Sequence, residues 1–362
     1  MKNYPADKIR NVGIFGHSGE GKTTLTEAML YNAGLTDRMG RVEDGSTVTD
    51  TDPEEKARGI SIGAAVAPYE WNGTKVNIID APGDFDFYGE VVEGMELADS
   101  ALIVVGAVSG PVVGSEKMMT MCRKQNKPRM IVINQIDREN ANFDKVMDEI
   151  TAKFGSNVVP IQLPIMDGDK LKGYVDLVNM TAKMYNGKAE KEEAIPANLQ
   201  DRAESLREAL VEAAAEGDAE LMDKYFEEMT LSNEETERGL KLGVMDGSIT
   251  LVTVCSAAQN AGVTTLMDNI LKYMPTADHA KLPKVVNDNG EVSDYKPTGK
   301  LAARVIKTVA DPFAGKVSII RVYDGELSSS ISALNTNAEK SEKSGAVGIL
   351  TAPGGLLGPK SG

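Results

Sequence analysis

The chain of 362 residues is 41% hydrophobic and 26% charged, which is typical of a soluble globular protein and leaves room for about two or three domains. Its formal net charge of −15 argues against loose binding to nucleic acid, which needs a basic surface, so we expect no DNA partner. The sequence has no apolar run of about 18 residues, no signal-peptide core after residues 1–5 and no disulfide framework from Cys122 and Cys255, and it therefore predicts a cytoplasmic protein without membrane contact.

The chain alternates apolar runs with longer amphipathic stretches from residue 10 to about residue 155. Near-continuous apolar runs are typical of strands that are buried on both faces in a parallel sheet. We predict strands at residues 11–15, 76–80, 101–105 and 130–134, and helices at residues 24–32 and 115–125. This alternation favours the α/β class, with a doubly wound, mostly parallel sheet.

A phosphate-binding motif follows the first predicted strand. It fits the pattern G-x-x-x-x-G-K-[ST], and its residues are Gly16, His17, Ser18, Gly19, Glu20, Gly21, Lys22, Thr23 and Thr24. Glycines let backbone N–H groups converge on phosphate oxygens, and the next helix directs its positive N-terminal end at the anion. We expect Lys22 to reach the β- and γ-phosphates of a nucleotide, and the Thr23 hydroxyl to bind Mg²⁺.

Two further segments have the placement of nucleotide switches. Ser61, in an Arg-Gly-Ile-Ser-Ile sequence at residues 58–62, is predicted to bind Mg²⁺ through its hydroxyl when a γ-phosphate is present. The charged run at residues 50–58 would then become ordered. Asp80 opens a D-x-x-G motif at the end of a predicted strand. We expect Asp80 to hold Mg²⁺ through water, and the Gly83 N–H to sense the γ-phosphate.

Asn134, Gln135 and Asp137 lie in a sequence similar to N-K-x-D at the end of another predicted strand. The Asp137 carboxylate is expected to accept hydrogen bonds from the guanine N1–H and N2–H₂ groups. Asn134 would brace the base and the phosphate loop, while Gln135 stands where a lysine normally packs its stem over the base. Ser256 and Ala257 resemble a short loop whose backbone N–H contacts guanine O6. Together these signals predict GTP and GDP as ligands.

The segment between the N-Q-x-D motif and Ser256 is far too long for one crossover helix, so residues from about 157 to 249 are predicted to form an inserted subdomain. We expect short strands at residues 160–165, 173–178 and 182–185, a long helical stretch at residues 199–229, and then a strand at 251–255 and a helix at 263–274. The helical stretch has apolar residues that we assign to packing, namely Leu206, Leu210, Val211 and Leu221.

The remaining chain predicts a β domain. Residues 275–297 read as a linker, strands are predicted at 300–308 and 316–323 with a turn after them, and the Gly/Pro-rich residues 344–362 lack strand alternation. So few strands would leave open sheet edges, and we therefore expect the β domain to be incomplete. Either the chain is a fragment of a longer protein or its tail is atypical. The predicted limits are 1–280 for the nucleotide-binding domain, 281–297 for the linker and 298–362 for the β domain.

Taken together, these motifs resemble the elongation factor G family of translational GTPases. Further similarity lies at residues 160–165, 172–177 and 311–316, and the resemblance extends from about residue 8 to about residue 343. It implies a GTP-binding domain with a family-typical insert, followed by the start of a β-barrel domain. It also implies Mg²⁺-dependent hydrolysis of GTP on the ribosome, where large-subunit RNA stimulates the reaction, by a protein that we expect to be a monomer.

Four residues depart from that family. Asp84 stands where the family has a histidine that positions the attacking water, so Asp84 and Gly83 are the catalytic candidates. A carboxylate there repels the γ-phosphate and cannot reproduce the hydrogen bonds of histidine. Gly19 replaces an aspartate and Ser61 a threonine. With Gln135, these changes predict a divergent paralogue of elongation factor G whose catalysis is impaired.

Two alternatives stay open. The protein could be a binding module that occupies the ribosome while GTP is bound and hydrolyses GTP weakly or not at all. Ribosomal protection proteins, which resemble this family, are the model for this alternative. It could also be a P-loop enzyme that uses ATP, although the order of the motifs favours GTP.

Overall fold

The computed structural model describes residues 4–186, 189–287, 289–311, 315–352 and 355–356. Contacts divide the chain into two compact units, one that ends at Ala277 and one that begins at Asp278. The first unit contains a seven-stranded and a four-stranded sheet. In the second, the described residues form only two-stranded sheets.

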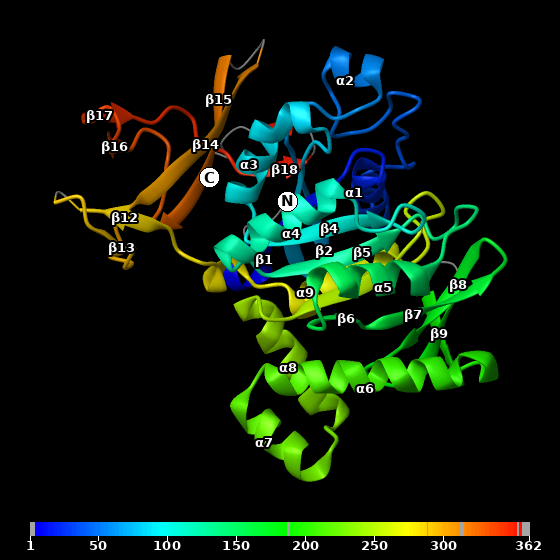
Figure 1. Ribbon diagram of the computed structural model, residues 1–362. Coiled ribbons are helices and arrows are strands. Elements are labelled where there is room, and N and C mark those ends of the chain that lie inside the picture. The colour runs from blue at the N-terminus through cyan, green and yellow to red at the C-terminus, as the bar shows by residue number, and fades with distance from the viewer. Residues whose placement is uncertain (1–3, 187–188, 288, 312–314, 353–354, 357–362) are drawn as a thin grey trace. The chain divides into compact units, whose positions relative to one another are not determined.

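The seven-stranded sheet is the centre of the first unit (Figure 1). Its strand order is β2-β3-β1-β4-β5-β11-β6, and every neighbouring pair is parallel except β2 and β3. The strands are β1 (Ile9–Gly16), β2 (Ala65–Trp71), β3 (Thr74–Asp80), β4 (Ser100–Gly106), β5 (Arg129–Asn134), β6 (Val158–Pro160) and β11 (Thr250–Val254). The predicted doubly wound, mostly parallel α/β fold is confirmed.

Helices cover both faces of this sheet. α1 and α9 pack against each other, while α3, α4 and α5 lie on the opposite face (Figure 1). The elements are η1 (Ala6–Lys8), α1 (Lys22–Asn32), α2 (Pro53–Arg58), η2 (Phe85–Phe87), α3 (Tyr88–Leu97), α4 (Val113–Gln125), α5 (Phe143–Phe154) and α9 (Val263–Tyr273). Every residue of β4, β5 and β11 is buried, which explains their continuous apolar runs.

The antiparallel edge strand β2 was not predicted from the sequence. It pairs with β3 from Ala65 opposite Asp80 to Trp71 opposite Thr74. Asn72 and Gly73 form the two-residue turn, and both have positive φ angles, 44° and 75°. An Asn-Gly pair between apolar segments is the strongest short-range signal of a hairpin, so the sequence did contain the information for this strand.

Four strands of the parallel sheet end where the predicted motifs begin. β1 ends at Gly16, β3 at Asp80, β5 at Asn134 and β11 at Val254. The carboxyl ends of parallel strands meet at one edge of a sheet, and ligands bind there at the point where the strand order reverses. In this sheet the strand order reverses at β1. The strands that follow β1 in the chain first lie on one side of it, as β2 and β3, and then on the other side, beginning with β4.

Within its described residues, the segment predicted as an insert forms a four-stranded antiparallel sheet, a short 3-10 helix and three α-helices. The sheet order is β10-β9-β8-β7. The elements are β7 (Gln162–Asp167), β8 (Lys170–Asp176), β9 (Thr181–Asn186), β10 (Ala189–Glu193), η3 (Ala197–Leu199), α6 (Gln200–Glu216), α7 (Ala219–Glu228) and α8 (Asn233–Asp246). The strand expected at residues 160–165 is divided, because β6 joins the seven-stranded sheet beside β11.

The single helical stretch expected at residues 199–229 is also divided. α6 ends at Glu216, and the Asp218 side chain caps α7 by accepting hydrogen bonds from two backbone N–H groups. A Cβ atom at Gly217 would collide with the Gly239 carbonyl of α8, so the break lets two helices approach closely. The four apolar residues assigned to packing are all buried, namely Leu206, Leu210, Val211 and Leu221.

The second unit consists of antiparallel hairpins. Its elements are η4 (Ala277–His279), which crosses the division between the units, and β12 (Lys284–Val286), β13 (Val292–Asp294), β14 (Ala302–Asp311), β15 (Gly315–Asp324), β16 (Ser332–Asn335), β17 (Lys340–Lys343), β18 (Leu350–Ala352) and β19 (Gly355–Leu356). The expected linker thus contains the hairpin β12–β13, and the tail, where no strand was expected, contains β18. Residues 312–314 of the similar segment 311–316 lie outside the described residues.

Within the described ranges, none of the helices has both the length and the apolar character that crossing a membrane requires.

Candidate nucleotide-binding site

The phosphate-loop motif forms the connection from β1 to α1. Gly19 and Gly21 both have φ of 81°, a backbone conformation that glycine adopts without strain. Gly21 is the N-terminal cap of α1, no described side chain caps this helix, and its first turn has no acidic residue. The first N–H groups of α1 therefore point into the loop without a side-chain partner, as an anion site requires.

Lys22 is buried at the start of α1, and its Nζ donates a hydrogen bond to the His17 carbonyl at 2.8 Å. Burial lowers the pKa of Lys22, and the charges of Asp80, Glu20 and Asp50 oppose that shift. The Lys22 charge thus interacts with three carboxylates, of which only Glu20 belongs to the phosphate loop. Thr24, the last residue of the motif, is half-buried in the first turn of α1.

Gly83 of the D-x-x-G motif lies directly against the phosphate loop. A Cβ atom at this position would collide with Lys22 Nζ and would lie 2.7 Å from the Ser18 nitrogen. In this conformation only glycine fits there, and its own backbone is next to the groups that are predicted to bind phosphate.

The three predicted magnesium ligands come together from three different elements. Thr23 Oγ1 lies 3.0 Å from Ser61 Oγ, and the nearby Thr23 hydroxyl favours the charged form of Asp80. Burial raises the pKa of Asp80 to about 7, an effect that the charge of Lys22 opposes. Asp80 Oδ1 is buried, and no described residue forms a hydrogen bond with it. Hydroxyl and carboxylate oxygens beside an unpaired buried oxygen fit a hard cation such as Mg²⁺.

Asp50 belongs to the same cluster, although the sequence analysis did not select it. It is 4% exposed, it accepts a hydrogen bond from Thr47 at 3.3 Å, and the nearby Ser61 hydroxyl favours its charged form. Burial raises its pKa, an effect that Lys22 opposes. In the sequence Asp50 opens an ordinary charged run, so only the tertiary structure distinguishes it from its exposed neighbours.

The predicted guanine-binding residues form a braced arrangement. Asn134 Nδ2 donates to the Glu20 carbonyl at 2.9 Å, and its Oδ1 accepts from the Ala257 N–H at 3.0 Å. Asn134 therefore links the phosphate loop to the predicted base loop. Gln135 has φ of 63° and donates from Nε2 to the Gly19 carbonyl at 2.9 Å.

Asp137 carries a hydrogen-bond acceptor that is left unpaired among the predicted guanine-binding residues. Its Oδ1 is buried and has no hydrogen-bond partner among the described residues. A buried unpaired carboxylate oxygen is costly unless a ligand satisfies it. Ser256 and Ala257 instead use their groups within the protein, because Ser256 Oγ accepts from the Gln259 N–H and the Ala257 N–H donates to Asn134.

The Glu20 side chain lies against the end of β4. Its Oε1 accepts a hydrogen bond from Ser109 Oγ at 2.9 Å, and a Cβ atom at Gly106 would collide with Oε2. Burial raises the pKa of Glu20, and the hydrogen bond from Ser109 opposes the shift. Of this residue, only the backbone is placed to bind phosphate.

Asp84 forms a helix cap. Its side chain accepts a hydrogen bond from the Asp86 N–H at 3.0 Å, and it is the N-terminal cap of η2. Aspartate is among the favoured residues for that role, which histidine does not share. The substitution at the predicted catalytic position therefore has a local structural effect, whatever its effect on hydrolysis.

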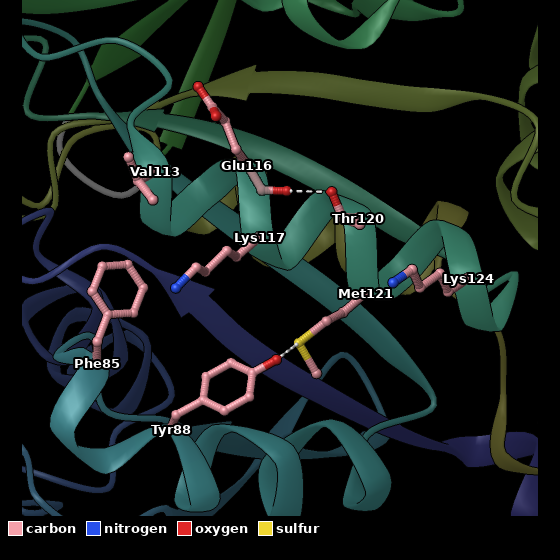
Figure 2. Close-up of a pocket in the computed structure, with 8 residues that line it drawn as sticks. All are labelled: Phe85, Tyr88, Val113, Glu116, Lys117, Thr120, Met121 and Lys124. Atoms are coloured by element: carbon pink, nitrogen blue, oxygen red, sulfur yellow. Dashed lines mark hydrogen bonds between the residues drawn. The ribbon is translucent and has the colours of Figure 1, made fainter.

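Beside Asp84, a surface groove runs between α4 and the segment of η2 and α3 (Figure 2). Lys117 Nζ lies 3.8 Å from the centre of the Phe85 ring, and the Tyr88 hydroxyl donates to Met121 Sδ at 3.1 Å. The opposite side of the Phe85 segment meets the phosphate loop, because the rings of Phe85 and His17 are 5.7 Å apart.

Comparison with known proteins shows the family of the chain. Residues 7–276 match the family described as Elongation factor Tu GTP binding domain. The structure is similar to the crystal structure of a protein from Thermus thermophilus, ttk003000868, with a TM-score of 0.84 and 31% sequence identity. That match covers 98% of this chain and 51% of the other, so the chain spans about half the length of that protein.

The fold and the phosphate-loop site define a P-loop GTPase. More narrowly, the chain belongs to the elongation factor Tu GTP-binding domain family, a family of translational GTPases. The resemblance found in the sequence is confirmed at this level, and the assignment as a divergent paralogue of elongation factor G stays a prediction.

Proposed function

We propose that this protein binds GTP and GDP together with Mg²⁺ and hydrolyses GTP in translation. The observation that carries the proposal is the convergence of Thr23, Ser61 and Asp80 beside Lys22. The unpaired oxygen of Asp137 at the other end of the site supports guanine as the base.

Each group has a definite task in this proposal. Backbone N–H groups of the phosphate loop and the Lys22 ammonium bind the phosphates, and the Gly83 N–H senses the γ-phosphate. The hydroxyls of Thr23 and Ser61 bind Mg²⁺, and Asp80 holds it through water, with Asp50 beside them. The bound cation would neutralise charge on the β- and γ-phosphates.

The base is bound by the other half of the site. Asp137 accepts hydrogen bonds from the guanine N1–H and N2–H₂ groups, and Asn134 holds the two loops around the base. Calorimetry with GTP and with ATP tests this assignment. We expect heat of binding with GTP alone, and equal affinity for ATP would contradict the guanine assignment.

We further propose that the ribosome is the partner, with large-subunit RNA as the stimulating surface, and that the protein is a cytoplasmic monomer. Membership in a family of translational GTPases supports the ribosome as partner. Co-sedimentation with ribosomes in the presence of a non-hydrolysable GTP analogue tests it, and equal sedimentation with GDP and with the analogue would contradict a GTP-dependent interaction.

Hydrolysis is proposed to be slow, because Asp84 places a carboxylate where the resembling family has a histidine. Its side chain is already engaged by the Asp86 N–H, so it is a poor group for orienting a water molecule. We expect Asp84→His to raise ribosome-stimulated GTP turnover. Equal turnover by the wild-type protein and the variant would show that catalysis is not impaired by this residue.

A further inference from the structure

A carboxylate with no assigned task lies one helical turn beyond the predicted magnesium ligand of α1. Glu27 follows Thr23 by four residues, so both lie on the same face of the helix. Glu27 has no exposed surface, and no ion pair involves it in the part of the chain that the structure describes. A buried carboxylate without a cation must be stabilised by hydrogen bonds.

Backbone N–H groups of the loop after α1 supply those hydrogen bonds. Glu27 Oε1 accepts from the Val48 N–H at 2.6 Å, and Oε2 accepts from the Gly40 N–H at 3.1 Å. The neighbouring Thr49 N–H also favours the charged form of Glu27. Burial raises the pKa of Glu27, and the hydrogen bonds from Val48 and Gly40 oppose the shift.

The loop has little regular structure of its own to hold it. Between the end of α1 and the start of α2, the described backbone forms only turns and bends. The fit around the carboxylate is nevertheless close. A Cβ atom at Gly40 would lie 2.5 Å from Glu27 Oε2, 2.6 Å from the Ser46 carbonyl and 2.9 Å from Thr47 Cα.

The residues next to those N–H groups enter the magnesium cluster. Thr49 Oγ1 donates to Asp80 Oδ2 at 3.2 Å, and the next residue, Asp50, has the Ser61 hydroxyl as a neighbour. Glu27 belongs to the helix and not to the loop. Its carboxylate is linked to the predicted metal site through its hydrogen bond with Val48 and the short stretch of backbone that follows.

We propose that Glu27 is a positioning residue for the magnesium site: its carboxylate holds the loop at residues 40–50 on α1, so that Thr49 and Asp50 stay beside Asp80 and Ser61. The inference rests on the proposed binding of GTP with Mg²⁺ and adds a residue that acts without touching nucleotide or metal. Residues that orient metal ligands in this way typically change metal affinity by about 10- to 100-fold when they are replaced.

The test compares Glu27→Gln with Glu43→Gln, which removes the same charge from an exposed position of the same loop. Binding of a fluorescent, non-hydrolysable GTP analogue is titrated with Mg²⁺, and GDP binding is measured separately in EDTA. We expect Glu27→Gln to need about tenfold more Mg²⁺ while its affinity for GDP in EDTA changes less than about twofold. Glu43→Gln should match the wild-type protein in both measurements.

Two results overturn the proposal. The first is a magnesium dependence of Glu27→Gln equal to that of the wild type. The second is an equal loss of analogue binding and of GDP binding in EDTA, because that pattern indicates a general defect in folding. If the wild-type protein binds no guanine nucleotide, the proposed function fails first, and this result is distinct from either of the others.

Gly40→Ala tests the same contact from the loop side, in case Glu27→Gln does not fold. The added methyl group collides with the carboxylate and the neighbouring backbone. We expect the same increase in the Mg²⁺ requirement, with GDP binding in EDTA retained. A folded Gly40→Ala protein with wild-type magnesium dependence would also refute the role of Glu27.

Discussion

The two halves of the nucleotide site are built in different ways. In the half predicted to bind the base, neutral groups are paired within the protein, as Asn134 shows by linking Glu20 to Ala257. In the half predicted to bind phosphate and magnesium, the charge of Lys22 interacts with the carboxylates Asp80 and Asp50. The first half is complete except for one acceptor, whereas the second gathers negative charge that a cation must balance.

This difference explains why the two halves respond differently to a ligand. A site of paired neutral groups keeps its shape when it is empty, and it selects a ligand by the acceptor that it leaves open. A cluster of buried carboxylates is costly to keep charged without a cation. We therefore expect substitutions in the magnesium half to change stability and binding together, and substitutions in the base half to change binding alone.

The largest effect is expected from Lys22→Ala. Loss of a buried, hydrogen-bonded charge should weaken GTP binding by at least about 100-fold. It should also lower the free energy of unfolding by about 3 kcal/mol, because it leaves Asp80 and Asp50 without their cation. Calorimetry and urea unfolding measure the two effects, and Lys124→Ala on the exposed side of α4 is the control. A variant of unchanged stability would contradict the electrostatic contrast between the halves.

Asp137→Asn should affect binding alone. Loss of hydrogen bonds to a charged acceptor is expected to weaken GTP binding by about 1.5–3 kcal/mol. Because the asparagine amide can donate to the additional carbonyl of xanthine, xanthosine triphosphate should bind more tightly than GTP. The melting temperature without nucleotide should not fall, since Asp137 Oδ1 has no partner among the described residues. Retention of GTP preference would exclude Asp137 as the guanine reader.

Gly83→Ala should have an intermediate effect. The new methyl group collides with Lys22 Nζ, so the loop must move away from the phosphate groups, at an expected loss of about 1–3 kcal/mol in binding of a GTP analogue. GDP lacks the γ-phosphate and should be affected less. The ratio of the two dissociation constants, measured by calorimetry, checks this expectation, and equal losses would show that Gly83 does not sense the γ-phosphate.

The smallest effect is expected from Gln135→Lys. The side chain is half-buried and donates one hydrogen bond to the Gly19 carbonyl. A lysine keeps the apolar stem and can donate to the same acceptor. We expect the affinity for GTP to change by less than about 1 kcal/mol. A tenfold gain would instead show that the charge of the usual lysine is a major part of base binding.

The strand ends illustrate how much of the site could be predicted. Asp80 and Asn134 end apolar runs, and the geometry of parallel strands brings such residues to one edge of the sheet. Ser61 could be selected by its motif, and the structure places it 3.0 Å from Thr23. The division of the helical stretch at Gly217 was missed, because the close approach to Gly239 of α8 is visible only in three dimensions.

The sequence by itself determined the doubly wound class, the phosphate loop and the family resemblance, because glycine spacing and buried apolar runs are local properties of the chain. Motifs selected Asp80 and Asp137, but only the tertiary structure added two further acidic residues to the site. Asp50 and Glu27 look like ordinary charged residues until folding buries them against Ser61 and the loop at residues 40–48. Burial and hydrogen-bond partners depend on contacts between distant segments, and no local pattern contains them.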